Sequence, residues 1–147
     1  MRPLGSGKTT YAKRLEADGM VRLSIDVQMW RRGITDVLEL PVQTHAEIEA
    51  HLHERLLQLV GDGQDVVLDF SFWSRAMRAR WRQVLEPTGV VPEAIYLATP
   101  RSTALRRLQG RQGTHSDDYV VPDDLAARYI DHFEVPTPDE GPLTVIG

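Results

Sequence analysis

Gly5-Ser6-Gly7-Lys8-Thr9-Thr10 is the stretch of sequence that decides the fold. It matches the second half of the pattern G-x-x-x-x-G-K-[ST], in which backbone N–H groups of a glycine-rich turn cradle phosphates at the start of a helix. In that pattern Lys8 reaches the β- and γ-phosphates, and the hydroxyl of Thr9 is a ligand of Mg²⁺. The six residues therefore predict a phosphate-binding loop, or P-loop, for a nucleoside triphosphate.

The residues ahead of this motif depart from the pattern. The position of its first glycine is Arg2, and Met1-Arg2-Pro3-Leu4 does not form the strand that aims such a loop. We therefore expect a shortened N-terminus, with the first strand of the fold missing from the chain. The alternative interpretation is a flexible Gly-Ser segment followed by a chance Lys-Thr pair. The position of the motif, directly before a helix and then a strand that ends on an acid, favours the P-loop.

The chain beyond the motif alternates between strand and helix patterns. Strands are expected at 21–26, 65–70, 94–98 and 143–146. Helices are expected at 8–17, 44–60, 74–85, 102–109 or 102–111, and 122–133, and residues 27–42 have no regular pattern. Strands that alternate with helices predict right-handed βαβ units, and therefore a three-layer α/β fold with a parallel sheet. We expect a single domain spanning residues 1–147.

Two of the predicted helices have clear apolar faces. Thr44 and Glu47 have capping-box spacing at the start of the first, and Ser74 is a candidate cap for the second. Their expected buried residues are Ile48, Leu52, Leu56, Leu59 and Val60 in the first helix, and Met77, Trp81, Val84 and Leu85 in the second.

Composition limits the classes of function. The chain has 147 residues, no cysteine and no apolar run long enough to cross a membrane, which predicts a cytoplasmic protein without disulfides or thiolate metal sites. The net charge is -4, yet residues 75–111 contain eight arginines and two acids. A local basic block in an acidic protein favours a small anionic ligand over a long nucleic acid. An arginine-rich proteome would explain the preference for arginine over lysine, but not this clustering.

Four motifs, in order along the chain, carry a resemblance to a known family. They are the P-loop motif, Leu23-Ser24-Ile25-Asp26, Val66-Val67-Leu68-Asp69 with Phe72-Trp73-Ser74-Arg75, and Arg107-Leu108-Gln109-Gly110-Arg111. Together they resemble the P-loop kinases that include polynucleotide kinase, zeta toxin and chloramphenicol phosphotransferase, and especially small bacterial predicted kinases, through residues 133–140. The resemblance implies a nucleoside-kinase-like P-loop NTPase fold, ATP and Mg²⁺ as cofactors, and a short lid at about 106–121.

The resemblance also implies a role for each of two carboxylates. Asp26 would accept or orient the proton of the substrate hydroxyl, which suits a carboxylate beside the γ-phosphate. Its alternative role is to cap the next helix. Asp69 resembles the Walker B acid that holds Mg²⁺, directly or through water. An ordinary carboxylate at the end of a strand is the alternative for Asp69.

The resemblance implies phosphate contacts for arginines as well. Arg107 and Arg111 are four residues apart and share a helix face, so they would clamp the triphosphate from the lid. Arg75 is a candidate for contact with the transferred phosphate or the substrate, with an exposed arginine at a helix start as its alternative. Trp73, beside the end of a strand, is a candidate for the substrate pocket.

These features predict a Mg²⁺-dependent phosphotransferase that moves the γ-phosphoryl group of ATP to a hydroxyl of a small molecule. Two alternatives stay open: a regulatory module that binds or hydrolyses ATP, and an inactive, truncated relative. The acceptor is also open, because members of the family phosphorylate 5′-hydroxyl nucleic acids, antibiotics, sugar nucleotides and polyols.

Overall fold

The computed structural model describes residues 8–34, 41–109 and 123–146. Its α-helices are α1 (Lys8–Ala17), α2 (Ile25–Arg31), α3 (Val42–Gly61), α4 (Arg75–Leu85), α5 (Arg101–Gln109) and α6 (Asp123–Asp131). Its strands are β1 (Val21–Ser24), β2 (Val66–Asp69), β3 (Ala94–Leu97) and β4 (Leu143–Ile146), and two 3-10 helices are η2 (Glu86–Thr88) and η3 (Pro138–Glu140). In these parts of the chain no helix is long and apolar enough to span a membrane.

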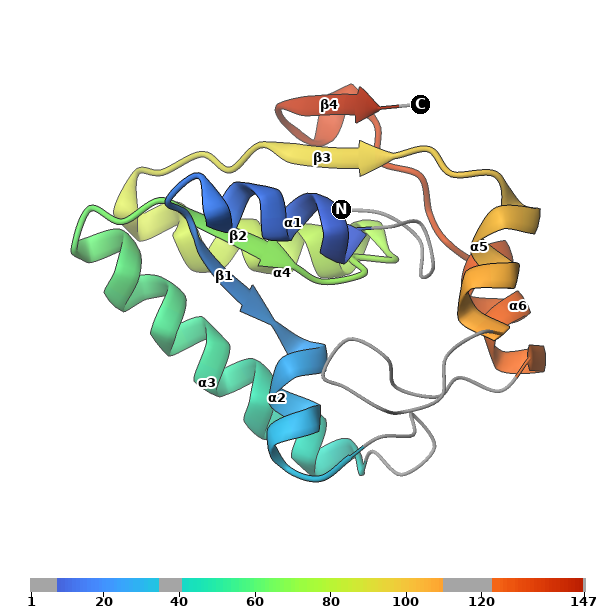
Figure 1. The fold of residues 1–147 in the computed structure, drawn as a ribbon. Helices are drawn as coiled ribbons and strands as arrows, with labels where there is room; N and C mark the ends of the chain where they lie inside the picture. Colours follow the sequence, from blue (N-terminus) through green and yellow to red (C-terminus); the bar gives the residue numbers. More distant parts are fainter. Residues whose placement is uncertain (1–7, 35–40, 110–122, 147) are drawn as a thin grey trace.

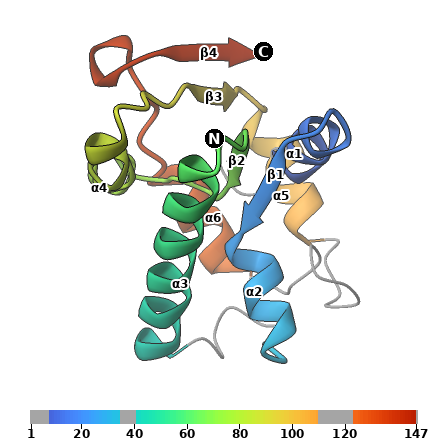
Figure 2. The same cartoon turned by 90° about the vertical axis from the view of Figure 1, so that its left-hand side faces the viewer.

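The strands pair in parallel. β1 lies beside β2, with Val21 opposite Val66 and Ser24 opposite Asp69, and β3 lies beside β4 in the same sense. Within the described residues these are two separate two-stranded sheets, although the arrows of β2, β3 and β4 run in one general direction (Figure 1). Figure 2 shows α1 on one side of β1 and β2, with α3 and α4 on the other. The predicted α/β fold, with parallel strands between layers of helices, is confirmed.

The core lies where α3 and α4 cover the strands. All the residues predicted for the two apolar faces are at least partly buried, and Val60 and Val84 are the two that are only partly buried. Phe70, which follows β2, packs its ring 4.8 Å from that of Trp81 in α4. Each large apolar side chain that is fully buried stabilises the fold by roughly 1.5–3 kcal/mol, so these two faces fix the position of β2 and its carboxyl end.

The first strand ends earlier than predicted. β1 stops at Ser24, because the extended Ser24 caps α2 and its hydroxyl accepts a hydrogen bond from the backbone N–H of Val27 at 3.3 Å. Asp26 therefore lies in the first turn of a helix and not at the end of a strand. The residues up to Arg31, predicted to be irregular, are helical. The hydroxyl of Ser24 satisfies a backbone N–H that would otherwise be unpaired at the start of a helix. This favours a helix from Ile25 onward, although the apolar pattern of the neighbouring residues predicted a strand.

The predicted capping box at the start of α3 is wrong. The helix begins at Val42, with Pro41 in the capping position and no side-chain cap, so Thr44 lies inside the helix. The fixed φ of proline, -63° here, suits the residue that leads into a helix. Glu47 instead accepts a hydrogen bond from the side chain of Gln43, one turn earlier. The cap predicted for α4 is confirmed, since the Ser74 hydroxyl accepts from the N–H of Met77 at 3.0 Å.

Candidate functional site

Three charged side chains from three elements meet where α1 begins. Lys8 is the first residue of α1 and is 6% exposed. Its Nζ lies 3.7 Å from Oδ2 of Asp26, in the first turn of α2, and 3.9 Å from Oδ1 of Asp69, at the end of β2. The fold thus brings together one cation and two carboxylates that are far apart in the sequence.

Asp69 is the most enclosed member of this cluster. Its residue is 4% exposed, and Oδ2 accepts hydrogen bonds from the Thr9 hydroxyl at 3.1 Å and from Nε and Nη2 of Arg22 at 3.0 and 2.7 Å. Its other oxygen, Oδ1, is buried and has no hydrogen-bond partner in the described part of the chain. A buried carboxylate oxygen that lacks a donor is a ready ligand for a cation.

Thr9 and Asp69 fit a magnesium ion by their chemistry. Mg²⁺ prefers oxygen ligands, and proteins commonly supply only one or two of these, with phosphates and waters completing the shell. The Thr9 hydroxyl and the Asp69 carboxylate are in contact and both supply oxygen. Among the described residues no group of three or more His, Asp or Glu could hold a metal alone. Phosphate oxygens and waters would complete the shell of an ion held by Thr9 and Asp69.

Arg22 is a member of the site that sequence reasoning missed. Its side chain is only 7% exposed, and it lies in β1, in register with β2, where it forms an ion pair with Asp69 at 2.7 Å. A charged residue inside an otherwise apolar strand, between Val21 and Leu23, was the available signal. The pair holds Asp69 in one orientation and offsets part of the negative charge of the cluster.

Trp73 and Arg75, both predicted near the substrate, contact the C-terminal segment. The carbonyl of Trp73 accepts from the N–H of Glu134 at 2.8 Å, and its side chain is 51% exposed. The guanidinium of Arg75 donates to Asp139 at 2.6 Å and to Thr137 at 3.3 Å, in a surface ion pair. The Asp139 bond raises the pKa of Arg75, and Arg75 and Thr137 together lower the pKa of Asp139 to about 2.

The remaining predicted residues fall at the edge of the described chain or beyond it. Thr10 is exposed on α1, and Arg107 is exposed on α5, which packs against α6. Gly5, Ser6, Gly7 and Arg111 lie outside the described residues, as do positions 110–121 of the expected lid.

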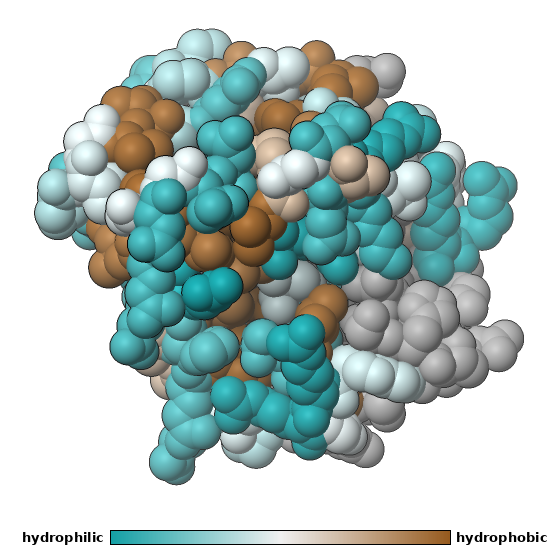
Figure 3. Space-filling view, turned by 60° about the vertical axis from the view of Figure 1, so that its left-hand side comes forward, coloured by the Kyte–Doolittle hydropathy of each residue, from teal (hydrophilic) through white to brown (hydrophobic). Residues whose placement is uncertain are grey.

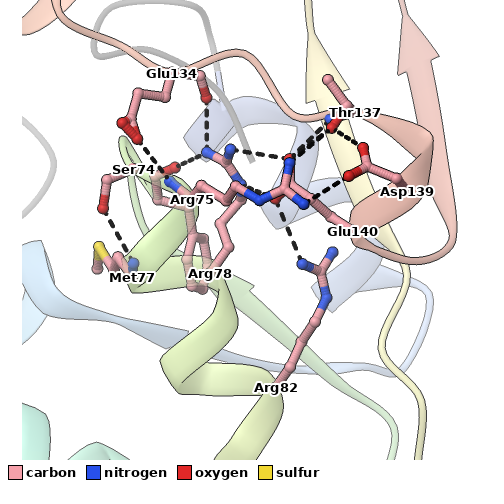
Figure 4. Close-up of polar contacts among 10 residues, drawn as sticks. Ser74, Arg75, Met77, Arg78, Arg82, Glu134, Thr137, Asp139 and Glu140 are labelled. Carbon is pink, nitrogen blue, oxygen red and sulfur yellow. Dashed lines mark hydrogen bonds and ion pairs between the residues drawn. The ribbon is translucent and has the colours of Figure 1, made fainter.

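A buried arginine beside the site was also missed. Arg78 of α4 is 2% exposed, and its Nη1 donates to the carbonyls of Phe72 at 2.9 Å and Glu134 at 2.7 Å. Its Nε and Nη2 bind both carboxylate oxygens of Glu140, at 2.7 and 3.2 Å (Figure 4). The hydrogen bonds from the Arg78 side chain, together with one from the backbone N–H of Thr137, lower the pKa of Glu140 to about 2. We call this arrangement of Arg78 and Glu140, with the carbonyls of Phe72 and Glu134, the arginine latch.

The arginine latch fixes the loop that follows β2. Phe72 has φ 47°, a conformation that is strained for a bulky residue and costs about 1–3 kcal/mol. It persists because Arg78 holds the Phe72 carbonyl and the ring is buried. One pattern in the sequence could have predicted the position of Glu140. Thr137-Pro138-Asp139-Glu140 has capping-box spacing, and these residues form that box in η3.

The fold and the lysine–carboxylate cluster define a class: a P-loop, nucleotide-binding α/β domain of the kinase-like type. Residues 3–136 match the model of the family described as "AAA domain", and the chain belongs to that family. No curated protein sequence matches the chain significantly.

Solved structures share the fold. A gluconokinase from Sinorhizobium meliloti 1021 has a TM-score of 0.62 and 20% sequence identity, over 99% of this chain and 78% of that one. Kti12 from Chaetomium thermophilum, in complex with ADP-AlF3, has a TM-score of 0.67 and 17% identity, over 99% of this chain and 86% of that one. The predicted resemblance to P-loop kinase-like proteins is therefore confirmed at the level of family and fold.

Proposed function

We propose that this protein is a Mg²⁺-dependent phosphotransferase that moves the γ-phosphoryl group of ATP to a hydroxyl of a small molecule. The observation that carries the proposal is the cluster at the start of α1. There Lys8 lies within 4 Å of Asp26 and Asp69, and Thr9 donates to Asp69. The two solved neighbours support it, because one is a gluconokinase and the other is in complex with ADP-AlF3.

Lys8 and the residues before it would bind the triphosphate. A lysine at the start of a helix adds a full positive charge to the positive end of the helix dipole, and both favour phosphate. Gly5, Ser6 and Gly7 would supply backbone donors, and Thr10 a further contact. The two ion pairs of Lys8 are long, at 3.7 and 3.9 Å, so phosphate oxygens would replace the carboxylates as its partners.

Thr9 and Asp69 would hold Mg²⁺, which neutralises phosphate charge during transfer. Asp26 would accept the proton of the acceptor hydroxyl while the oxygen of that hydroxyl attacks the γ-phosphorus. The bond from that phosphorus to the bridging oxygen breaks, and ADP leaves with the electron pair. Arg107 and Arg111 would stabilise the charge that develops on the phosphoryl oxygens, and Trp73 with Arg75 would contact the acceptor.

The test begins with a screen for the acceptor. Radiolabelled ATP and Mg²⁺ are incubated with the protein and, separately, polyols, sugars, nucleosides and aminoglycosides. With the best acceptor, Asp26→Asn should lower the transfer rate by about 10²–10⁴-fold, while the dissociation constant for ATP changes little. Asp18→Asn is the matched control, because Asp18 is exposed just after α1, and it should transfer normally.

Other outcomes select the alternatives. Normal transfer by Asp26→Asn would remove the base assignment. ATP hydrolysis without transfer to any acceptor would favour a regulatory module. No binding at roughly millimolar ATP would leave an inactive relative as the correct interpretation.

A further inference from the structure

Arg22 and Arg78 are both buried arginines that bind a carboxylate, but they bind it in different ways. Nε and Nη2 of Arg78 donate to the two separate oxygens of Glu140. Nε and Nη2 of Arg22 both donate to one oxygen of Asp69, Oδ2, at 3.0 and 2.7 Å. The first arrangement occupies a whole carboxylate, whereas the second occupies only half of one.

The two oxygens of Asp69 therefore differ. Oδ2 accepts a third hydrogen bond, from the Thr9 hydroxyl at 3.1 Å, so its lone pairs are fully used. Oδ1 is buried and accepts no hydrogen bond from the residues that the structure describes. The ammonium of Lys8, at 3.9 Å, is too far away to donate one. A cation that binds Asp69 thus meets one carboxylate oxygen and not two.

The pairing of β1 with β2 sets this geometry. Arg22 is in register with Val67, two residues before Asp69, so the side chains of Arg22 and Asp69 lie on the same face of the strand pair. Helix α1, which carries Thr9, packs against both strands. The helix and the strands together fix which oxygen of Asp69 faces Arg22 and Thr9.

Stability alone does not account for an arginine at this position. On the face drawn in Figure 3, hydrophilic side chains cover much of the surface around apolar patches, whereas the Arg22 side chain is only 7% exposed. Taking a guanidinium out of water can cost more than a buried ion pair returns, so apolar residues of similar size are often as stable or more so. Its neighbours in β1, Val21 and Leu23, are apolar. This favours a chemical role for Arg22, in what Asp69 can bind.

Arg22 also balances the charge of the candidate site. Lys8 and Arg22 carry two positive charges, and Asp26 and Asp69, which both pair with Lys8, carry two negative charges. A divalent ion that arrives alone therefore meets no net negative charge, and Asp69 offers it a single oxygen. A nucleoside triphosphate brings the missing negative charge and further oxygen ligands together.

We propose that Arg22 determines the specificity of the cation site: by holding Oδ2 of Asp69 and balancing its charge, it makes Mg²⁺ binding depend on a bound phosphate and disfavours Ca²⁺. Ca²⁺ often takes a carboxylate through both oxygens, whereas Mg²⁺ is satisfied by one or two carboxylates together with phosphate and water. The inference deepens the proposed function and rests on it, because it concerns the ion of the same reaction. Arg22 acts through Asp69 and is a positioning residue.

The first test measures the binding of Mn²⁺ to the protein without nucleotide, with the free ion counted by electron paramagnetic resonance. Mn²⁺ prefers the same oxygen ligands as Mg²⁺. In Arg22→Gln, loss of the positive charge should raise the Mn²⁺ affinity by roughly 10²–10³-fold. Poorer orientation of Asp69 should lower the affinity by about 10–100-fold. The charge effect is the larger, so we expect a net gain of about tenfold.

Three variants control this measurement. Arg80→Gln removes the same charge from a surface pair with Glu49, in which the arginine is 53% exposed, and should bind Mn²⁺ as weakly as the native protein. Arg22→Lys keeps the positive charge and should also bind weakly. Arg22→Gln combined with Asp69→Asn should lose the gain, because the ion then lacks its carboxylate ligand.

The second test compares the dissociation constant for ATP in Mg²⁺ with that in Ca²⁺, by titration calorimetry. The native protein should bind ATP more tightly in Mg²⁺. That preference should fall by about tenfold in both Arg22→Gln and Arg22→Lys, because one donating nitrogen in place of two holds Oδ2 less firmly. A purely structural role for Arg22 would weaken ATP binding equally in both ions and leave the ratio unchanged. Arg80→Gln should keep the native ratio.

The proposal is overturned if Arg22→Gln binds Mn²⁺ no better than the native protein, or if both Arg22 variants keep the native ratio of Mg²⁺ to Ca²⁺. If Arg22→Gln does not fold, as judged by circular dichroism, the ratio in Arg22→Lys decides. Failure of the proposed function has a different signature. The native protein would then not bind ATP, while the gain of Mn²⁺ binding in Arg22→Gln, which is measured without nucleotide, would still be seen.

Discussion

Replacing Glu140 by alanine tests whether the arginine latch holds the loop after β2. The Glu140 carboxylate receives hydrogen bonds from Nε and Nη2 of Arg78 and from the backbone N–H of Thr137, at 2.7, 3.2 and 2.8 Å. The side chains of Arg78 and Glu140 are only 2% and 3% exposed. Glu140→Ala therefore leaves a buried guanidinium without its counter-charge, which should cost about 3–5 kcal/mol of unfolding free energy.

The neighbouring residue is a matched control. Asp139 also pairs with an arginine of α4, but its side chain and that of Arg75 are 64% and 55% exposed. Water and salt screen such a pair, so Asp139→Asn should cost far less than Glu140→Ala. Urea unfolding, followed by far-ultraviolet circular dichroism at pH 7, measures both. Equal losses in the two variants would refute the reasoning.

Acid and a double variant separate charge from packing. The pKa of Glu140 falls from 4.5 to about 2 in the folded protein, so its contribution to stability is complete above about pH 4.5. The contribution is lost as the pH drops toward 2. Glu140→Ala should therefore show a smaller loss of stability between pH 5 and pH 2 than the native sequence. Arg78→Met combined with Glu140→Leu should recover only part of the lost stability. Removing both charges leaves neither unpaired, but the carbonyls of Phe72 and Glu134 lose the donor that Arg78 supplies.

Three further changes test other parts of the structure. Ser24→Ala removes the cap of α2 and should cost about 1 kcal/mol in urea unfolding; an unchanged midpoint would mean that the cap contributes nothing. Ile48→Ala, at a residue that is 0% exposed, should cost about 2–5 kcal/mol, whereas the exposed Leu57 of α3 should tolerate alanine with a small loss. Thr9→Val removes the hydroxyl that binds Asp69 and should abolish the effect of Mg²⁺ on ATP affinity, measured by titration with and without the metal. Equal Mg²⁺ dependence in both proteins would exclude Thr9 as a ligand.

Local patterns in the sequence were sufficient to predict most elements. The apolar face of α3 repeats with helical spacing, so its burial follows from the order of residues alone. The strands β2 and β3 are short, mainly apolar runs, which is sufficient to place them. The boundaries of the elements were harder to predict, because the residue that precedes a helix can set its start independently of the apolar pattern. Ser24 begins a helix that was not predicted, and Pro41 places the start of α3 two residues before the predicted one.

The buried arginines could not be predicted in this way. Arg22 and Arg78 are buried because each has a carboxylate partner 47 or 62 residues away. Their burial depends on contacts that only the folded chain forms. Lys8, Asp26 and Asp69 were each assigned to the site from a separate motif, and the structure brings their side chains together. Their chemical roles stay predictions, as does the glycine-rich turn at residues 5–7.

The arginine latch also bears on the order in which the protein folds during synthesis. Arg78 emerges from the ribosome long before Glu140, and β3 emerges long before its partner β4. Until residues 134–146 arrive, the nascent chain has a guanidinium with no anion to neutralise it and a strand edge open to other chains. Contacts between residues this far apart in sequence form slowly. The earlier elements should therefore remain sensitive to aggregation and proteolysis until synthesis reaches the C-terminal segment.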